Sequence, residues 1–156
     1  MISRVAELAG VELADVLRSR SFHFMTRGQL SELVDAGINL QLHTHRHRFP
    51  SNSRDECVRE IGDNRDSLRA LASDGLVHFC YPSGAYQPHQ KAWLAEVGIA
   101  SATTTRHGLC YPATDRFELP RFLDSEAYGA ETFDAALSGL LALARDPIAT
   151  LRHAAS

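Results

Sequence analysis

Helical and strand patterns alternate through most of the chain, and this order is the feature that most restricts its fold. Apolar residues at helical spacing, with start and stop signals at their ends, predict helices over 26–36, 54–72, 88–97 and 131–145. Strand patterns cover 38–42, 76–82 and 99–105, and a short extended segment covers 117–123. The alternation indicates parallel strands with helices packed outside them, as in an α/β barrel or a layered sheet.

Polar residues follow the points where the predicted strands end. His43 follows the first strand, the stretch YPSGAY follows the second, and TRHG follows the third. In parallel α/β architectures, functional sites gather at the carboxyl ends of the strands. We therefore expect a pocket at this edge of the fold.

The stretch QLHTHRHRFP places three histidines within five residues. His43 and His47 are four residues apart, so on a helical turn they share a face, whereas His45 points elsewhere. Two neutral imidazoles can bind a divalent metal when their nitrogens lie about 2.0–2.1 Å from one point. By spacing alone the histidines could also belong to an exposed polar loop. Their place after a strand favours the metal site.

The length and charge exclude several classes of function. A chain of 156 residues suits one domain over 1–156, with a helical lead-in over 1–21 and a carboxyl-terminal tail over 146–156. The net charge of −3 and the lack of a long basic run disfavour nucleic acid as a partner. No apolar run approaches the about 18 residues of a membrane span. The amino terminus lacks the apolar stretch of a signal peptide, so a cytoplasmic location is expected.

The three cysteines, Cys57, Cys80 and Cys110, have no CxxC spacing. An odd number of cysteines without such spacing disfavours both a disulfide framework and a zinc knuckle. We expect them to be reduced and mostly buried.

Several motifs resemble those of one enzyme family when they are taken in order. LHTHRH is similar to the second motif, His-Ser/Thr-x-x-His, of the polysaccharide deacetylase family, the NodB-homology carbohydrate esterases of family 4. HFCYPSGAY is similar to the third motif in the YPxGxY branch of that family. WLAEVGIASATTTRHGL and ELPRFL are similar to the strands that follow. The resemblance covers roughly Phe22 to Leu143.

The resemblance implies an incomplete, TIM-barrel-like (β/α) barrel and a hydrolase of non-peptide C–N bonds. Such an enzyme removes N-acetyl groups from a carbohydrate, so the implied partner is an acetylated carbohydrate. The implied cofactor is a divalent metal, zinc in most members, held by His43 and His47 together with an Asp. The metal polarises the acetyl carbonyl and activates water.

The resemblance also assigns roles in the third motif and beyond it. The backbone N–H of Ser83 would help to hold the oxyanion, and Arg121 would reach the pocket and orient a carboxylate. An edge-strand arginine on the surface is the alternative for Arg121. For Tyr81, a packed strand aromatic is the alternative. The substrate-binding residues that the resemblance implies are Tyr81, Pro82, Gly84 and Tyr86.

The sequence departs from the family pattern at its beginning. The first motif, Thr-Phe-Asp-Asp, is absent, and no Asp-Asp pair occurs in the sequence. That motif supplies the general base and the Asp ligand, and the motif of the general acid has no match either. We therefore expect the amino-terminal strand or strands to be missing. Among the carboxylates present, Asp124 is the best replacement candidate, since Asp55 and Glu56 suit a helix start.

Three explanations of this departure stay open. The chain is a fragment of a longer deacetylase, or a partner chain supplies the Asp ligand, or the chain is an inactive relative. Two other functions also stay open: a non-catalytic sugar-binding or regulatory relative, and a zinc hydrolase of another kind. The absence of HExxH disfavours the last.

Overall fold

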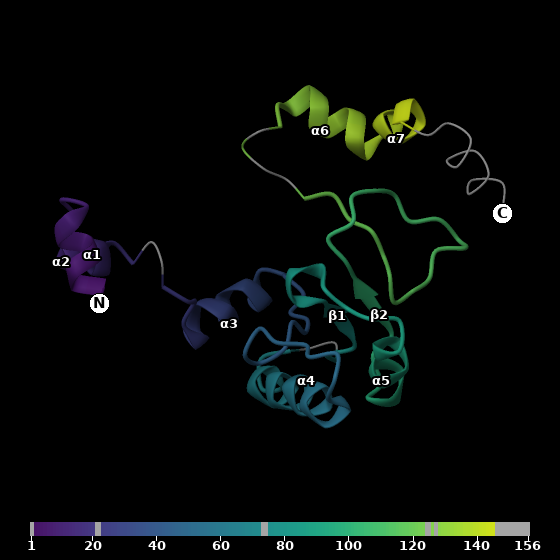
Figure 1. Cartoon of the computed structure of the whole chain (residues 1–156), viewed down its shortest axis with the longest axis horizontal. Coiled ribbons are helices and arrows are strands. Elements are labelled where there is room, and N and C mark those ends of the chain that lie inside the picture. The colour runs from purple at the N-terminus through teal and green to yellow at the C-terminus, as the bar shows by residue number, and fades with distance from the viewer. Residues whose placement is uncertain (1, 21–22, 73–74, 124–125, 127, 146–156) are drawn as a thin grey trace. The chain divides into compact units, whose positions relative to one another are not determined.

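A computed structural model describes residues 2–20, 23–72, 75–123, 126 and 128–145. It divides into two compact units, Met1–Ile38 and Asn39–Ser156. Figure 1 colours the first unit purple to blue and the second unit blue to yellow. The tail over 146–156 and the carboxylate candidate Asp124 lie outside the described residues.

The first unit consists of three short helices: α1 (Ile2–Leu8), α2 (Leu13–Ser19) and α3 (Arg27–Asp35). Gly10, with φ of 65°, separates α1 from α2. Thr26 caps α3 through its Oγ1, which accepts from the N–H of Gln29 at 3.3 Å. The Gln29 Oε1 accepts from the N–H of Thr26 at 2.9 Å, which completes the expected capping box.

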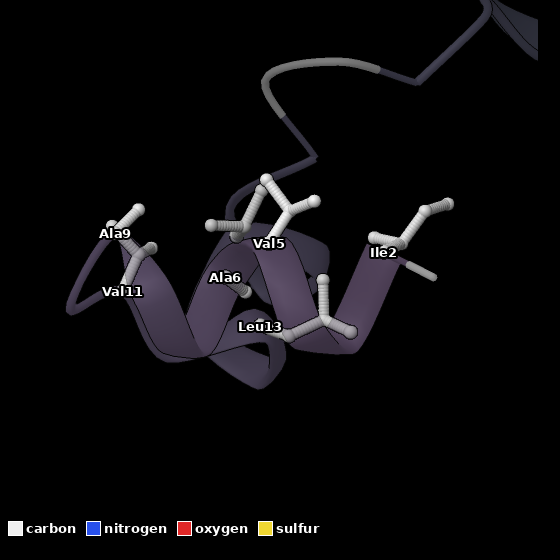
Figure 2. Close-up of a pocket in the computed structure, with 7 residues that line it drawn as sticks. Ile2, Val5, Ala6, Ala9, Val11 and Leu13 are labelled. Carbon is white, nitrogen blue, oxygen red and sulfur yellow. The ribbon is translucent and has the colours of Figure 1, made fainter.

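The helices α1 and α2 carry apolar side chains that line a hollow of about 360 Å³. Figure 2 shows these side chains on α1, on the turn that follows it and, at Leu13, at the start of α2. The lining residues are Ile2, Val5, Ala6, Ala9, Val11, Leu13 and Val16. No described residue of α1, α2 or α3 is buried. The described part of the first unit therefore has no buried core.

Four parallel segments form the centre of the second unit. The two strands are β1 (His78–Cys80) and β2 (Ser101–Thr103), which pair in parallel. Leu42 forms a parallel bridge to Phe79 on the free side of β1, and Leu119 forms one to Thr103 on the free side of β2. Segments that follow one another in the sequence thus also lie next to one another in the sheet. The predicted strand over 38–42 is wrong in extent, because the bridge at Leu42 is its one ladder contact.

The helices follow in the order that the sequence predicts. α4 (Arg54–Leu68) lies between Leu42 and β1, and α5 (Gln90–Glu96) lies between β1 and β2, whereas α6 (Ala130–Leu137) and α7 (Leu140–Arg145) come after Leu119. Figure 1 shows α4 and α5 beside β1 and β2. The single helix predicted over 131–145 is wrong, because Gly139 adopts φ of 79° and separates α6 from α7. No helix of the described residues is long and apolar enough to cross a membrane.

Apolar side chains from the parallel segments and from the helices form one core. Ile61 on α4 and Leu94 on α5 are 1% and 0% exposed. Burial of an aliphatic side chain of this size contributes roughly 1.5–3 kcal/mol. The core residues are Leu42, Ile61, Leu76, Phe79, Tyr81, Leu94, Ile99, Ala102 and Phe117. The three cysteines are free, as predicted, but the expectation that they are mostly buried is wrong, because Cys80 is half-buried and Cys110 is exposed.

Lys91 links α5 to the segment that enters the fourth parallel position. Its Nζ lies 2.8 Å from Asp115 Oδ2 and 2.7 Å from Glu118 Oε1. The hydrogen bond from Lys91 holds the pKa of both carboxyls below their usual range, and the carboxylates in turn raise the pKa of Lys91. A carboxyl whose pKa is lower in the folded state stabilises the fold above its usual pKa of about 4. That contribution is lost as the pH falls.

Replacing Lys91 by Met is expected to reduce the dependence of stability on acid. The free energy of unfolding at pH 7 should fall by at most about 1 kcal/mol, because these side chains stay partly exposed to solvent. Between about pH 5 and pH 3, the wild-type chain should lose more stability than the variant. Urea unfolding across this range measures both effects. Arg69→Met is the control, since the Arg69–Asp66 pair is 73% and 68% exposed. Equal acid dependence in wild type and Lys91→Met would contradict the expectation.

Candidate functional site

The carboxyl ends of the four parallel segments meet at one edge, as the sequence predicts. His43 follows Leu42, and the turn Pro82–Gly84 follows β1. Thr104 follows β2, and Arg121 lies two residues after Leu119. Parallel strands bring these ends together, so residues that are far apart in sequence surround one edge.

The imidazoles of His43 and His47 lie side by side. Their ring centroids are 4.9 Å apart, and the ring planes meet at 68°. The backbone that joins them is not the helical turn that the sequence suggested, because Thr44 and His47 have φ of 64° and 57°. A positive φ is rare for a β-branched residue and is found mostly at functional sites. The ring of His45 lies apart, with Nδ1 3.4 Å from the Ser67 hydroxyl.

The ring of His43 is oriented by a carbonyl group. Its Nδ1 lies 2.7 Å from the backbone oxygen of Cys80 at the end of β1. A carbonyl only accepts, so Nδ1 is the donor in this contact, and in a neutral imidazole Nε2 then has the lone pair. Imidazoles that bind metals have this arrangement, in which the second ring N–H donates to a carbonyl or carboxylate.

Two adjacent imidazoles are side chains of the type that binds zinc. Zinc sites in enzymes use three protein ligands and keep one position open. Among the described residues, no group of three His, Cys, Asp or Glu side chains could hold a metal. The described residues therefore do not supply a third ligand beside His43 and His47.

Thr44 braces the turn from within. Its side chain is buried, and its Oγ1 accepts from the N–H of Arg48 at 3.1 Å. The hydroxyl thus binds the backbone of the turn itself.

Two residues of α4 that the sequence analysis did not select also contact the turn. Asn64 Oδ1 accepts from the N–H of His43 at 3.0 Å. Glu60 is 7% exposed and binds the backbone and guanidinium of Arg46. Burial by itself raises the pKa of Glu60, but the hydrogen bonds from Arg46 outweigh it and keep that pKa below its usual range. No local pattern marks these residues, because both read as the polar face of a helix.

The turn after β1 contains two residues with left-handed backbone angles. Ser83 has φ of 55° and is exposed, and Gly84 has φ of 69°. A Cβ on Gly84 would collide with Thr105 Oγ1 and would lie 2.8 Å from the backbone nitrogen of Thr105. The close approach at Gly84 is therefore to the loop after β2. Its approach to a substrate stays a prediction.

The two tyrosines of the third motif differ in exposure. Tyr81 is 0% exposed, and its ring stacks on that of Tyr86 with centroids 4.5 Å apart. Burial raises the pKa of Tyr81, and its hydroxyl has no hydrogen-bond partner among the described residues. Tyr86 is half-buried, and its pKa is raised by burial and by Glu118. Tyr81 thus has the packing role that the sequence left open.

Arg121 is half-buried and is held by its backbone, whose N–H donates to the carbonyl of Arg106 at 2.9 Å. Its Nε is buried and has no hydrogen-bond partner among the described residues. Buried N–H groups are almost always paired in native structures. The orphaned Nε therefore marks a place where an acceptor is needed.

Comparison with known proteins gives a family and a fold. The family described as polysaccharide deacetylase matches residues 16–102, more than half of the chain. No curated protein sequence matches the chain.

Three solved structures resemble the chain. A Streptococcus pyogenes deacetylase in complex with acetate has a TM-score of 0.66 at 24% identity, over 76% of this chain and 53% of that one. A Bacillus cereus polysaccharide deacetylase has a TM-score of 0.64 at 18% identity, over 75% and 38%. A deacetylase domain from Bordetella bronchiseptica has a TM-score of 0.56 at 20% identity, over 63% of this chain and 48% of that one. The chain spans about half the length of these relatives or less. It has their fold, an incomplete (β/α) barrel, as the sequence predicts.

Proposed function

The chain belongs to the polysaccharide deacetylase family, and from this premise we propose that it is a metal-dependent hydrolase that removes N-acetyl groups from a carbohydrate. One observation carries the proposal. His43 and His47 lie side by side at the carboxyl edge of the barrel, with His43 Nδ1 bound to the Cys80 carbonyl. This arrangement leaves a ring nitrogen of His43 available to a metal.

His43 and His47 would hold the metal, which we propose to be zinc. A bound zinc ion supplies a Lewis acid for the acetyl carbonyl and for water. The reaction adds water to the carbonyl carbon, breaks the C–N bond and passes a proton to the leaving amine, so that acetate and a free amino sugar result. We propose that an Asp supplied by residues outside the described part, or by a partner chain, completes the ligand set.

The turn after β1 and Arg121 would bind the oxyanion, orient a carboxylate and contact the sugar. The N–H of Ser83, in an exposed turn, would be a hydrogen-bond donor for the oxyanion. The buried Nε of Arg121 would donate to a carboxylate and fix its orientation. Tyr81 supports Tyr86 by stacking. We propose that Tyr86, together with Pro82 and Gly84 in the same turn, borders the sugar.

A second function is favoured by a different observation. No third metal ligand accompanies the two histidines among the described residues, and the sequence has no Asp-Asp pair. These facts would suit a sugar-binding relative that binds the carbohydrate and has lost the chemistry. Such a protein should bind the sugar equally well with and without metal.

Acetate release separates the two functions. The zinc-loaded full chain is incubated with oligomers of N-acetylglucosamine, and released acetate is measured beside sugar binding. Our proposal predicts acetate release that a chelator and His47→Ala both abolish. Sugar binding without acetate release, unchanged by the chelator and by His47→Ala, would contradict it and support the binding protein.

A further inference from the structure

The backbone of the histidine turn, residues 43–47, is hydrogen-bonded to α4. The N–H of His43 donates to Asn64 Oδ1 at 3.0 Å. The N–H of His45 donates to the backbone carbonyl of Glu60 at 3.1 Å. The N–H of Arg46 donates to Glu60 Oε2 at 2.7 Å. Three backbone donors of the turn thus bind two residues of one helix.

Glu60 and Asn64 are four residues apart on α4, so they share one face of the helix. Glu60 uses both carboxylate oxygens, since Oε1 accepts from the Arg46 guanidinium at 2.8 Å while Oε2 accepts from the Arg46 N–H. The carboxylate is buried, and hydrogen bonds to a buried ionised group are shorter and stronger than neutral ones. The helix face therefore holds the turn at two points along its length.

The turn needs such support. Thr44 and His47 both have positive φ, which is unfavourable for residues other than glycine and persists only where the surroundings fix it. A turn that relaxed would separate the two imidazoles and would release His43 Nδ1 from the Cys80 carbonyl. A metal would then have to order the turn as it binds, which lowers its affinity.

We propose that Glu60 and Asn64 are positioning residues, which hold the backbone of the histidine turn so that His43 and His47 face one metal. Neither residue touches the metal or the substrate in this proposal. The effect of these two residues on catalysis rests on the metal site proposed above. Their effect on the orientation of the His43 ring does not depend on a metal.

Matched substitutions separate positioning from general stability. Asn64→Ala removes the acceptor of the His43 N–H, whereas Asn64→Asp keeps an acceptor oxygen. Glu60→Gln puts an NH₂ group in front of one of the two Arg46 donors. Asp63→Asn is its control, because Asp63 binds the Arg46 guanidinium at 2.9 Å, whereas in the described part of the chain its side chain makes no hydrogen bond to the turn backbone. Circular dichroism identifies any variant that does not fold.

Two readouts are measured on the full chain: the zinc dissociation constant, and the ¹H–¹⁵N NMR signals of the His43 ring without metal. We expect Asn64→Ala and Glu60→Gln to weaken zinc binding about 10-fold or more, as for other residues that orient metal ligands. Both should also lose the slowly exchanging Nδ1–H signal of His43. Asn64→Asp and Asp63→Asn should stay close to wild type in both readouts.

Wild-type zinc affinity and an unchanged His43 signal in both Asn64→Ala and Glu60→Gln would overturn the proposal. If Glu60→Gln does not fold, the comparison of Asn64→Ala with Asn64→Asp decides. If the wild-type chain alone binds no zinc, its own residues do not form the metal site, and a partner chain would have to supply the Asp. The NMR signal then still decides: its loss in Asn64→Ala supports positioning, and its retention contradicts it.

Discussion

Alanine in place of Gly84 is expected to lower the free energy of unfolding by about 2–4 kcal/mol, the sum of overpacking and an unfavourable backbone angle. The added Cβ would collide with Thr105 Oγ1, which can rotate away, and would lie 2.8 Å from the Thr105 backbone nitrogen, which cannot. The φ of 69° adds a further penalty for any residue with a side chain. Urea unfolding of the purified variant measures the loss.

Gly98→Ala is the matched control. Gly98 has φ of 76°, and a Cβ there would meet no atom within 4 Å. It should therefore show the backbone effect alone, about 1 kcal/mol. Equal losses in the two variants would mean that the loops after β1 and β2 do not approach as closely as the structure places them.

Replacing both His43 and His47 by alanine is expected to weaken zinc binding by roughly 10⁴-fold or more. Apparent binding free energies of about 10–16 kcal/mol for four-ligand zinc sites correspond to roughly 3 kcal/mol for each ligand. Removal of two ligands should therefore abolish measurable binding. Competition with a chromophoric chelator measures the dissociation constant.

His45→Ala is the control for the double variant. His45 belongs to the same turn, but its ring lies near Ser67 on α4. Its loss should leave zinc affinity within about 3-fold of wild type, as expected of a surface substitution. A loss of zinc affinity in His45→Ala as large as in the double variant would show that His43 and His47 are not the specific ligands of the metal.

Local sequence signals were sufficient for the order of the elements. Periodic apolar residues and the capping box at Thr26 place the helices, and the strand patterns lead into the polar residues at the carboxyl edge. These signals succeed because each depends on neighbours within a few residues. The break at Gly139 also had a visible signal, a glycine inside the helical pattern, that the prediction did not use.

Contacts between distant segments could not be derived in this way. A side chain at Gly84 would collide with Thr105, which belongs to another loop. The ring of His43 is oriented by the carbonyl of Cys80, 37 positions away in the sequence. Glu60 and Asn64 look like ordinary exposed helix residues in the sequence. Their function depends on a turn that folds back onto α4, which no local pattern records.

The central claim is that His43 and His47 together bind one metal, and X-ray absorption at the zinc edge of the zinc-loaded full chain tests it most directly. The account predicts scattering from two imidazoles with zinc–nitrogen distances of about 2.0–2.1 Å. That scattering should vanish in the His43→Ala/His47→Ala variant. A spectrum dominated by a sulfur ligand at about 2.3 Å, or imidazole scattering that survives in the variant, would contradict the claim.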